Sequence, residues 1–218
     1  MDDLTPPRWP GGTFQIITLL ESTIEGTRDG ANVKSVTSHF RCQHSLLSFS
    51  VSHHFLWWTK SCFAFAWQGK YHGAGEQAKR ASDLDPAYFF PQMAYGWIDI
   101  EAGKIHDAIP ELRRAKAMES PAFVTAFLGY AYGASGDRAR AMAEMEDLKR
   151  RSLHGHVLPF NLALVYIGLG DRERALDHLE RAYASDSQWM GLKNDRIFDP
   201  LRSEPRFVAL MRKLRFDN

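Results

Sequence analysis

Residues 126–141 read AFLGYAYGASGDRARA, and this stretch decides the fold. A run of small and apolar residues ends at Gly136, and a new run begins after Asp137. A glycine just beyond the end of one helix, followed by a polar residue and a second helix, is typical of a tight connection. The stretch therefore predicts two consecutive helices that meet at Gly136.

The same arrangement recurs along the chain at a nearly constant spacing. Four glycines stand at spacings of 34, 33 and 34 residues, namely Gly69, Gly103, Gly136 and Gly170. Small or apolar residues recur with them in the stretch that follows, namely Ala74, Ala108, Ala141 and Ala175, then Ala78, Leu112, Met145 and Leu179, then Ala81, Ala115, Leu148 and Ala182. A period near 34 residues indicates a stacked array of helical pairs.

The first helix of each pair also carries a small residue at a fixed place. These residues are Cys62, Gly96, Gly129 and Ala163. We expect them to let the two helix backbones of a pair approach closely, with larger apolar side chains filling the space around them. A single pair has too little apolar surface to form a core alone, so neighbouring pairs must stack.

The stretches 126–141 and 161–175 resemble tetratricopeptide repeats. The resemblance covers about residues 55–187 and implies an all-α, right-handed solenoid of four helical hairpins. We expect the hairpins at residues 55–85, 87–120, 121–152 and 157–185. Residues 1–54 carry no helical repeat and are expected to form an irregular or poorly ordered leader, and residues 188–218 a C-terminal capping segment.

The capping segment has a recognisable sequence of its own. Residues 199–207 read DPLRSEPRF, which is similar to the closing segment of tetratricopeptide arrays in bacterial signalling proteins. Ser203 can cap a helix that has Pro205 in its first turn. The apolar face of that helix would consist of Phe207, Leu210, Met211 and Leu214.

Composition excludes several classes of function. The net charge of +1 is too small to indicate binding to nucleic acid or to an anionic membrane surface. No run of about 20 apolar residues and no secretory signal is present in the sequence. Two cysteines cannot form a disulfide framework, so we expect a reducing, cytoplasmic location.

Motifs for catalysis are also missing. The sequence contains no phosphate-binding loop, nucleophile elbow or kinase catalytic loop, so we expect no enzyme, no catalytic residue and no cofactor. Potential metal ligands cluster loosely at His39, Cys42, His44, His53, His54 and Cys62. Their spacing does not match the tight pairs of structural zinc sites, so we expect no metal site.

The feature that points to a function is aromatic. In a tetratricopeptide solenoid, one face of the first helices lines a concave groove, and here that face is apolar. The candidate groove residues are Phe63, Trp67, Phe90, Met93, Trp97, Phe123, Tyr130, Phe160 and Leu164. Several large aromatic side chains exposed together would exceed the apolar patch of an ordinary monomer, so something should cover them.

Three coverings are open. Each aromatic residue can pack against the next repeat, a partner peptide or helix can fill the groove, or residues 1–54 or an upstream domain can fold into it. We predict a non-catalytic protein–protein interaction module, with Trp97 and Tyr130 as the first choices for partner anchors. A clamp for a terminal carboxylate is not expected, because the inward positions carry no Lys or Arg. The alternative is the regulatory tail of a signalling enzyme or transcriptional regulator whose effector domain is absent from this chain.

Overall fold

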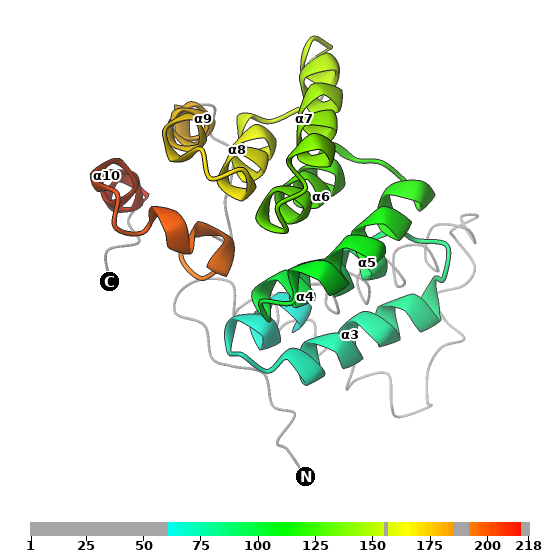
Figure 1. Ribbon diagram of the computed structural model, residues 1–218. Coiled ribbons are helices and arrows are strands. Elements are labelled where there is room, and N and C mark those ends of the chain that lie inside the picture. Colours follow the sequence, from blue (N-terminus) through cyan, green and yellow to red (C-terminus); the bar gives the residue numbers. More distant parts are fainter. Residues whose placement is uncertain (1–60, 155–156, 185–191, 215–218) are drawn as a thin grey trace, which may run out of the picture. The chain divides into compact units, whose positions relative to one another are not determined.

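The computed structural model describes residues 61–154, 157–184 and 192–214, and all regular structure in these ranges is helical. A helical stretch at residues 61–67 precedes α3 (Tyr71–Leu84). The elements that follow are α4 (Phe90–Glu101), α5 (Ile105–Met118), α6 (Ala122–Ala134), α7 (Arg138–Ser152), α8 (Pro159–Gly168) and α9 (Arg172–Ala184) (Figure 1). A 3₁₀ helix, η1 (Arg196–Leu201), and α10 (Pro205–Lys213) come last. The expected all-α fold is confirmed for the described ranges, whereas the proposed leader lies outside them.

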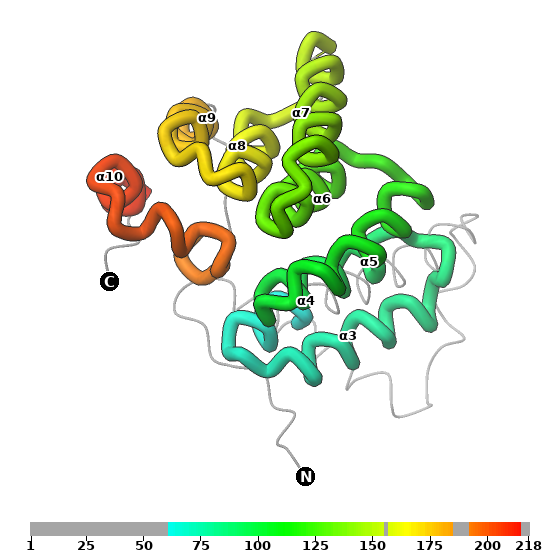
Figure 2. Tube along the Cα trace, in the orientation of Figure 1, coloured from blue at the N-terminus to red at the C-terminus, as the bar shows by residue number. Residues whose placement is uncertain are grey.

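Consecutive helices pack in pairs. Close contacts join α4 to α5, α6 to α7 and α8 to α9, and each pair also contacts the next through α5 with α6 and α6 with α8. The path of the chain through these pairs can be followed in Figure 2. The second, third and fourth predicted repeats therefore each correspond to one packed pair of helices.

The turn within each pair has the same hydrogen bonds at all four glycines. The N–H of Gly136 donates to the carbonyl oxygen of Gly133 at 3.0 Å, and the N–H of Asp137 donates to that of Tyr132 at 2.9 Å. This is the Schellman arrangement, which satisfies the last carbonyl groups of a helix. It requires a positive φ, which is +72°, +77°, +87° and +75° at Gly69, Gly103, Gly136 and Gly170. A residue with a Cβ adopts this conformation only at a cost, so the periodic glycines have a direct physical cause.

Two of the turns also begin the next helix with an aspartate cap. Asp137 Oδ1 accepts a hydrogen bond from the backbone N–H of Arg140 at 3.1 Å. Asp171 Oδ1 accepts one from the backbone N–H of Arg174 at 3.1 Å. Each carboxylate satisfies a backbone donor that the helix itself leaves unpaired.

The recurring small and apolar residues form the core, as predicted. All twelve positions of the second helices are buried, and the four alanines Ala74, Ala108, Ala141 and Ala175 have no exposed surface. The small residues of the first helices are buried as well: Cys62, Gly96, Gly129 and Ala163. The period of the sequence is therefore the period of the packing.

Glycine allows two neighbouring pairs to touch backbone to backbone. A Cβ added to Gly133 of α6 would lie 2.5 Å from the carbonyl carbon of Gly168 in α8. A Cβ added to Gly168 would lie 2.4 Å from the carbonyl oxygen of Tyr130. Backbone atoms cannot move aside as a side-chain tip can, so this crossing depends on the absence of side chains at both positions.

The last described helix, α10, packs on the last pair. α10 contacts α9, and Arg206 forms ion pairs with three carboxylates of α9, those of Glu173, Asp177 and Glu180, at 3.0, 2.8 and 2.9 Å. Phe207 and Leu210 are the buried residues of α10. Pro205 is the first helical residue, as expected, but the residue before it, Glu204, is at the N-cap position instead of Ser203.

None of the helices in the described ranges combines the length and apolar character needed to cross a lipid bilayer.

We predict opposite effects for alanine at two glycines that both lie inside helices. Gly133→Ala should lower the free energy of unfolding by about 1–3 kcal/mol, because the added methyl group meets the backbone of α8. Gly75→Ala in α3 should raise it by about 0.5–1 kcal/mol, because no atom of the described residues lies within 4 Å of the new Cβ and alanine favours the helix. Urea unfolding followed by circular dichroism measures both. Equal stability of the two variants would contradict the backbone contact.

Candidate partner-binding site

The nine candidate groove residues differ in exposure. Met93, Trp97, Tyr130 and Leu164 are buried, and Trp97 and Leu164 have no exposed surface. The other five are partly buried against the core, namely Phe63, Trp67, Phe90, Phe123 and Phe160. Trp97 lies in contact with the first repeat, since its ring centroid is 4.4 Å from that of Phe63 and 6.3 Å from that of Trp67. The two residues chosen as first anchors, Trp97 and Tyr130, are thus both covered.

Phe89, which directly precedes α4, connects the aromatic side chains of the second repeat to those of the third. It packs against Tyr88 at 4.9 Å and against Phe123 at 5.9 Å between ring centroids. Phe90 lies within the same cluster, 6.5 Å from Phe63. The first helices of three successive pairs are therefore joined by one continuous set of aromatic contacts.

A segment from the end of the chain occupies part of this face. Residues 192–201, which we call the docked segment, include η1, and η1 contacts both α4 and α8. Its apolar side chains Ile197, Phe198 and Leu201 have no exposed surface. Phe198 lies 6.0 Å from Phe160 of α8 between ring centroids. One of the candidate groove residues is thus in contact with the chain's own C-terminal region.

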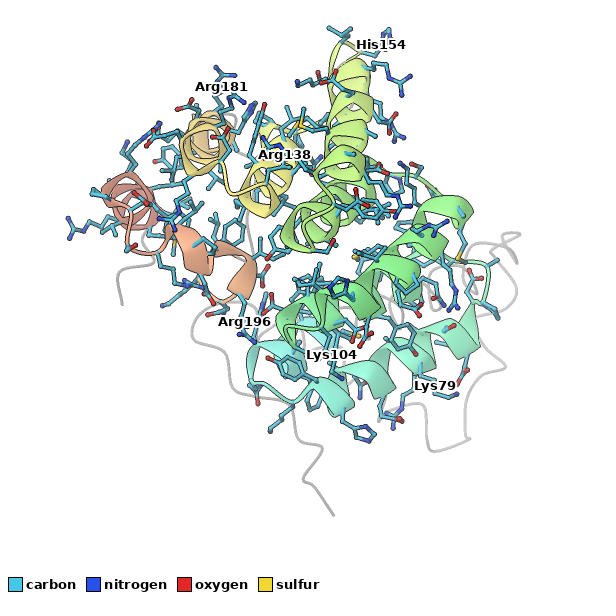
Figure 3. The ribbon with its side chains drawn as sticks, in the orientation of Figure 1. Lys79, Lys104, Arg138, His154, Arg181 and Arg196 are labelled. Carbon is cyan, nitrogen blue, oxygen red and sulfur yellow. The ribbon has the colours of Figure 1, made fainter. Side chains whose placement is uncertain are left out.

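Glu101 at the end of α4 holds the backbone of the docked segment. Its carboxylate accepts the backbone N–H of Arg196 with both oxygens, at 3.1 and 3.2 Å. The Arg196 guanidinium donates back to the carbonyl oxygen of Glu101 at 3.0 Å, and the Tyr71 hydroxyl donates to the same oxygen at 2.9 Å. Figure 3 labels Arg196 near Lys104, which follows α4 in the chain.

Asp195 holds the docked segment to the first repeat. Its Oδ1 accepts a hydrogen bond from the indole Nε1 of Trp67. The Trp97 Nε1 is buried and has no well-formed hydrogen bond within the described ranges, but its N–H also favours the ionised form of Asp195. The backbone oxygen of Asp195 accepts from the Arg202 guanidinium at 3.0 Å. The carboxylate is therefore bound by tryptophan, and no Lys or Arg side chain of the described residues lies at hydrogen-bond distance from it.

Glu101 and Asp195 both carry buried carboxyl groups, and burial raises the pKa of both. Burial raises the pKa of Glu101 to about 8, and the negative charge of Asp195 adds to the effect, whereas the Arg196 backbone N–H opposes it. Burial raises the pKa of Asp195 to about 7, opposed by the indole N–H groups of Trp67 and Trp97. Like charges in a site with few charged partners disfavour double ionisation. The pair therefore holds protons at a pH where exposed carboxyl groups have lost them.

The expectations about metal binding are only partly addressed by the structure. His39, Cys42, His44, His53 and His54 lie outside the described residues. Cys62 is buried, and burial raises the pKa of its thiol to about 12, so the thiol stays protonated at neutral pH. In the part of the chain that the structure describes, no three His, Cys, Asp or Glu side chains gather in a way that could hold a metal ion.

Sequence reasoning missed the polar residues of this site. Glu101 stands two residues before the turn glycine, where the other three repeats have the uncharged residues Trp67, Ala134 and Gly168. A charged residue at an otherwise uncharged repeat position is a signal that could have marked it. Asp195 and Arg196 lie beyond the last repeat, where no period is available for comparison.

Comparison with known proteins gives no further information about the family or the function of the chain. No protein-family model matches the sequence, and no curated protein is significantly similar to it. The resemblance to tetratricopeptide repeats therefore depends on the residue pattern alone.

We predict that Glu101→Gln stabilises the protein increasingly as the pH rises. A carboxyl group whose pKa is raised on folding contributes stability that is complete below its unfolded pKa of about 4 and is lost as the pH rises through its folded pKa. The variant has no charge to bury, so it escapes this loss. One pKa unit corresponds to about 1.4 kcal/mol. The melting temperature of the variant minus that of the native chain should therefore grow by more than about 3 °C between pH 5 and pH 9.

The difference between the two proteins isolates this pair of carboxyl groups. His178, whose burial lowers its pKa, gives the opposite slope near neutral pH but is common to both proteins. Glu76→Gln on the exposed side of α3 is the matched control, and its difference from the native chain should stay constant with pH. A constant difference for Glu101→Gln as well would mean that the pair is not buried as described.

Proposed function

We propose that this chain is a non-catalytic protein–protein interaction module of the tetratricopeptide kind. Its helical pairs would together form a right-handed solenoid, and the aromatic side of its first helices would bind a peptide or helix of a partner protein. The proposal includes a cytoplasmic location, in line with Cys62, whose thiol is buried and forms no disulfide within the described residues.

The observation that carries the proposal is the docked segment itself. A short stretch of chain lies against α4 and α8 and is held by buried apolar side chains, a carboxylate bound to an indole and a backbone N–H bound to a carboxylate. These are the contacts by which protein surfaces recognise peptides, in which a few buried anchors supply most of the affinity. A face that accepts one such segment has the chemistry to accept another.

The repeat frame supports the same function. Buried alanines and Schellman turns recur in every pair, so the first helices of successive pairs present corresponding positions in a row. The first helix of each pair also carries a partly exposed aromatic residue, namely Phe63, Phe90, Phe123 and Phe160. A row of this kind suits an extended or helical partner better than a small molecule.

We predict that Phe123→Ala weakens capture of the physiological partner by about tenfold or more, because a partly exposed aromatic residue is a typical anchor. Met142→Ala is the matched control, because Met142 lies on a second helix, α7, and is 37% exposed. Partners captured by cross-linking from the source cells would be identified and then measured with purified proteins. Fully buried Trp97 is less suitable, because Trp→Ala in a core costs about 3–5 kcal/mol of stability.

Both variants should keep the helical circular dichroism signal of the native chain. Equal capture by the Phe123→Ala variant, the Met142→Ala variant and the native chain would show that the aromatic side of the first helices is not the binding face.

A further inference from the structure

The docked segment makes contacts that a capping segment does not need. In a repeat array each repeat contacts its neighbours, and a cap has to cover only the last one. α10 meets this requirement by packing on α9. The docked segment instead reaches the first and second repeats, because Asp195 bonds to Trp67 and Arg196 bonds to Glu101. These contacts connect residues that are 128 and 95 positions apart in the sequence.

The contacts resemble a peptide in a binding site. One acidic side chain is bound by an indole N–H, the next backbone N–H is bound by a carboxylate, and the following Ile197 and Phe198 are fully buried. The residues that alternate with these are exposed, namely Asn194, Arg196 and Asp199, although the Arg196 guanidinium also donates to the Glu101 carbonyl oxygen. Anchors and solvated positions thus occur along one short stretch, as in a bound ligand.

The attachment of the docked segment also has a free-energy cost, the burial of two carboxyl groups, that an apolar core contact would not have. Glu101 and Asp195 bring two carboxyl groups into a buried site, and within the described ranges neither carboxylate has an ion pair at hydrogen-bond distance. Burying a charge without a close counter-charge is costly. The groups that face this pair are the Trp67 and Trp97 indoles, the Tyr71 and Tyr130 hydroxyls, the guanidinium groups of Arg196 and Arg202, and the carboxylate of Asp199.

We propose that residues 192–201 are an internal ligand of the partner-binding face, and that a partner segment with an acidic residue followed by two apolar residues, one of them aromatic, displaces them. The inference rests on the proposed function and specifies the chemistry of the partner. The free site then consists of the Trp67 indole and the Glu101 carboxylate, with the apolar surface of α4 and α8 beside them.

A labelled peptide tests the exchange with the full chain. The probe is a fluorescein-labelled synthetic peptide with the sequence of residues 192–202, and its binding is followed by fluorescence anisotropy. All binding is measured at pH 5, below the raised pKa of Asp195, so that no charge on this carboxyl group opposes the attachment. Asp195→Ala removes the acceptor of the Trp67 indole N–H and leaves the site intact, so this variant should bind the peptide about tenfold more tightly than the native chain does. Asn194→Ala is the matched control, because its side chain is exposed, and it should bind the peptide as the native chain does.

The peptide itself has a matched control. A peptide in which alanine replaces the residue equivalent to Asp195 should bind the Asp195→Ala variant about tenfold more weakly than the native peptide, because it cannot accept the indole N–H.

Hydrogen–deuterium exchange of the native chain gives a second measurement that needs no variant. Saturating native peptide should speed exchange of the backbone amides at residues 192–201, including that of Arg196, and leave exchange in α6 and α7 unchanged.

Peptide that binds no variant, or that binds without faster exchange at 192–201, would show that the segment is a fixed part of the core. If that happens while capture of the physiological partner still depends on Phe123, the proposed function stands and the exchange is wrong. If the peptide displaces residues 192–201 but Phe123→Ala leaves capture of the partner unchanged, the site binds only the chain's own segment and the proposed function is wrong.

Discussion

The fold depends on the close approach of helix backbones at positions where the side chain is small or absent. Gly133 and Gly168 bring α6 and α8 into direct backbone contact, and Gly96 leaves room for the Leu112 side chain within the second pair. Close-packed interiors leave no room for an added methyl group at such places. The small residues Cys62, Gly96, Gly129 and Ala163 recur with the period of the turns, whereas Gly133 and Gly168 belong to the crossing of α6 and α8 alone. The regular stack in turn places the first helices of successive pairs side by side, with their aromatic residues in contact.

The C-terminal region uses the surface that this stacking creates. Phe198 and its apolar neighbours favour the attachment of the docked segment, because their side chains are buried by it. Glu101 and Asp195 fix the position of the segment through their hydrogen bonds, but they disfavour its attachment when they ionise. A segment that is held by both kinds of contact is positioned well but bound less tightly than apolar burial alone would allow. This balance is what an exchangeable ligand requires, since a segment that binds too tightly excludes every competitor. The hydrophobic cluster around Phe198 and Phe207 also links the docked segment to α10, so its release affects the closing helix.

Most of the fold could be predicted because its causes are local and periodic. The turn glycines, the buried alanines and the helix pairs follow from residue size and spacing, and the structure confirms each of them in the described ranges. The N-cap of α10 was placed one residue too early, because serine is the better capping residue and Glu204 has no side-chain cap bond. The candidate site was predicted as an apolar row, and its polar residues were missed. Asp195 and Trp67 are far apart in the sequence, and no periodicity relates a non-repeating tail to a position in the first repeat.

The backbone amide of Arg196 tests the central claim most directly, because its hydrogen bond to Glu101 exists only if the docked segment lies on the repeats. Nuclear magnetic resonance of the isotope-labelled full chain can measure its exchange rate and its proximity to the Glu101 side chain. We predict a slowly exchanging amide with a nuclear Overhauser effect to the Glu101 side-chain protons. A random-coil chemical shift and rapid exchange with water at residues 192–201 would contradict the docking on which the proposed partner chemistry is based.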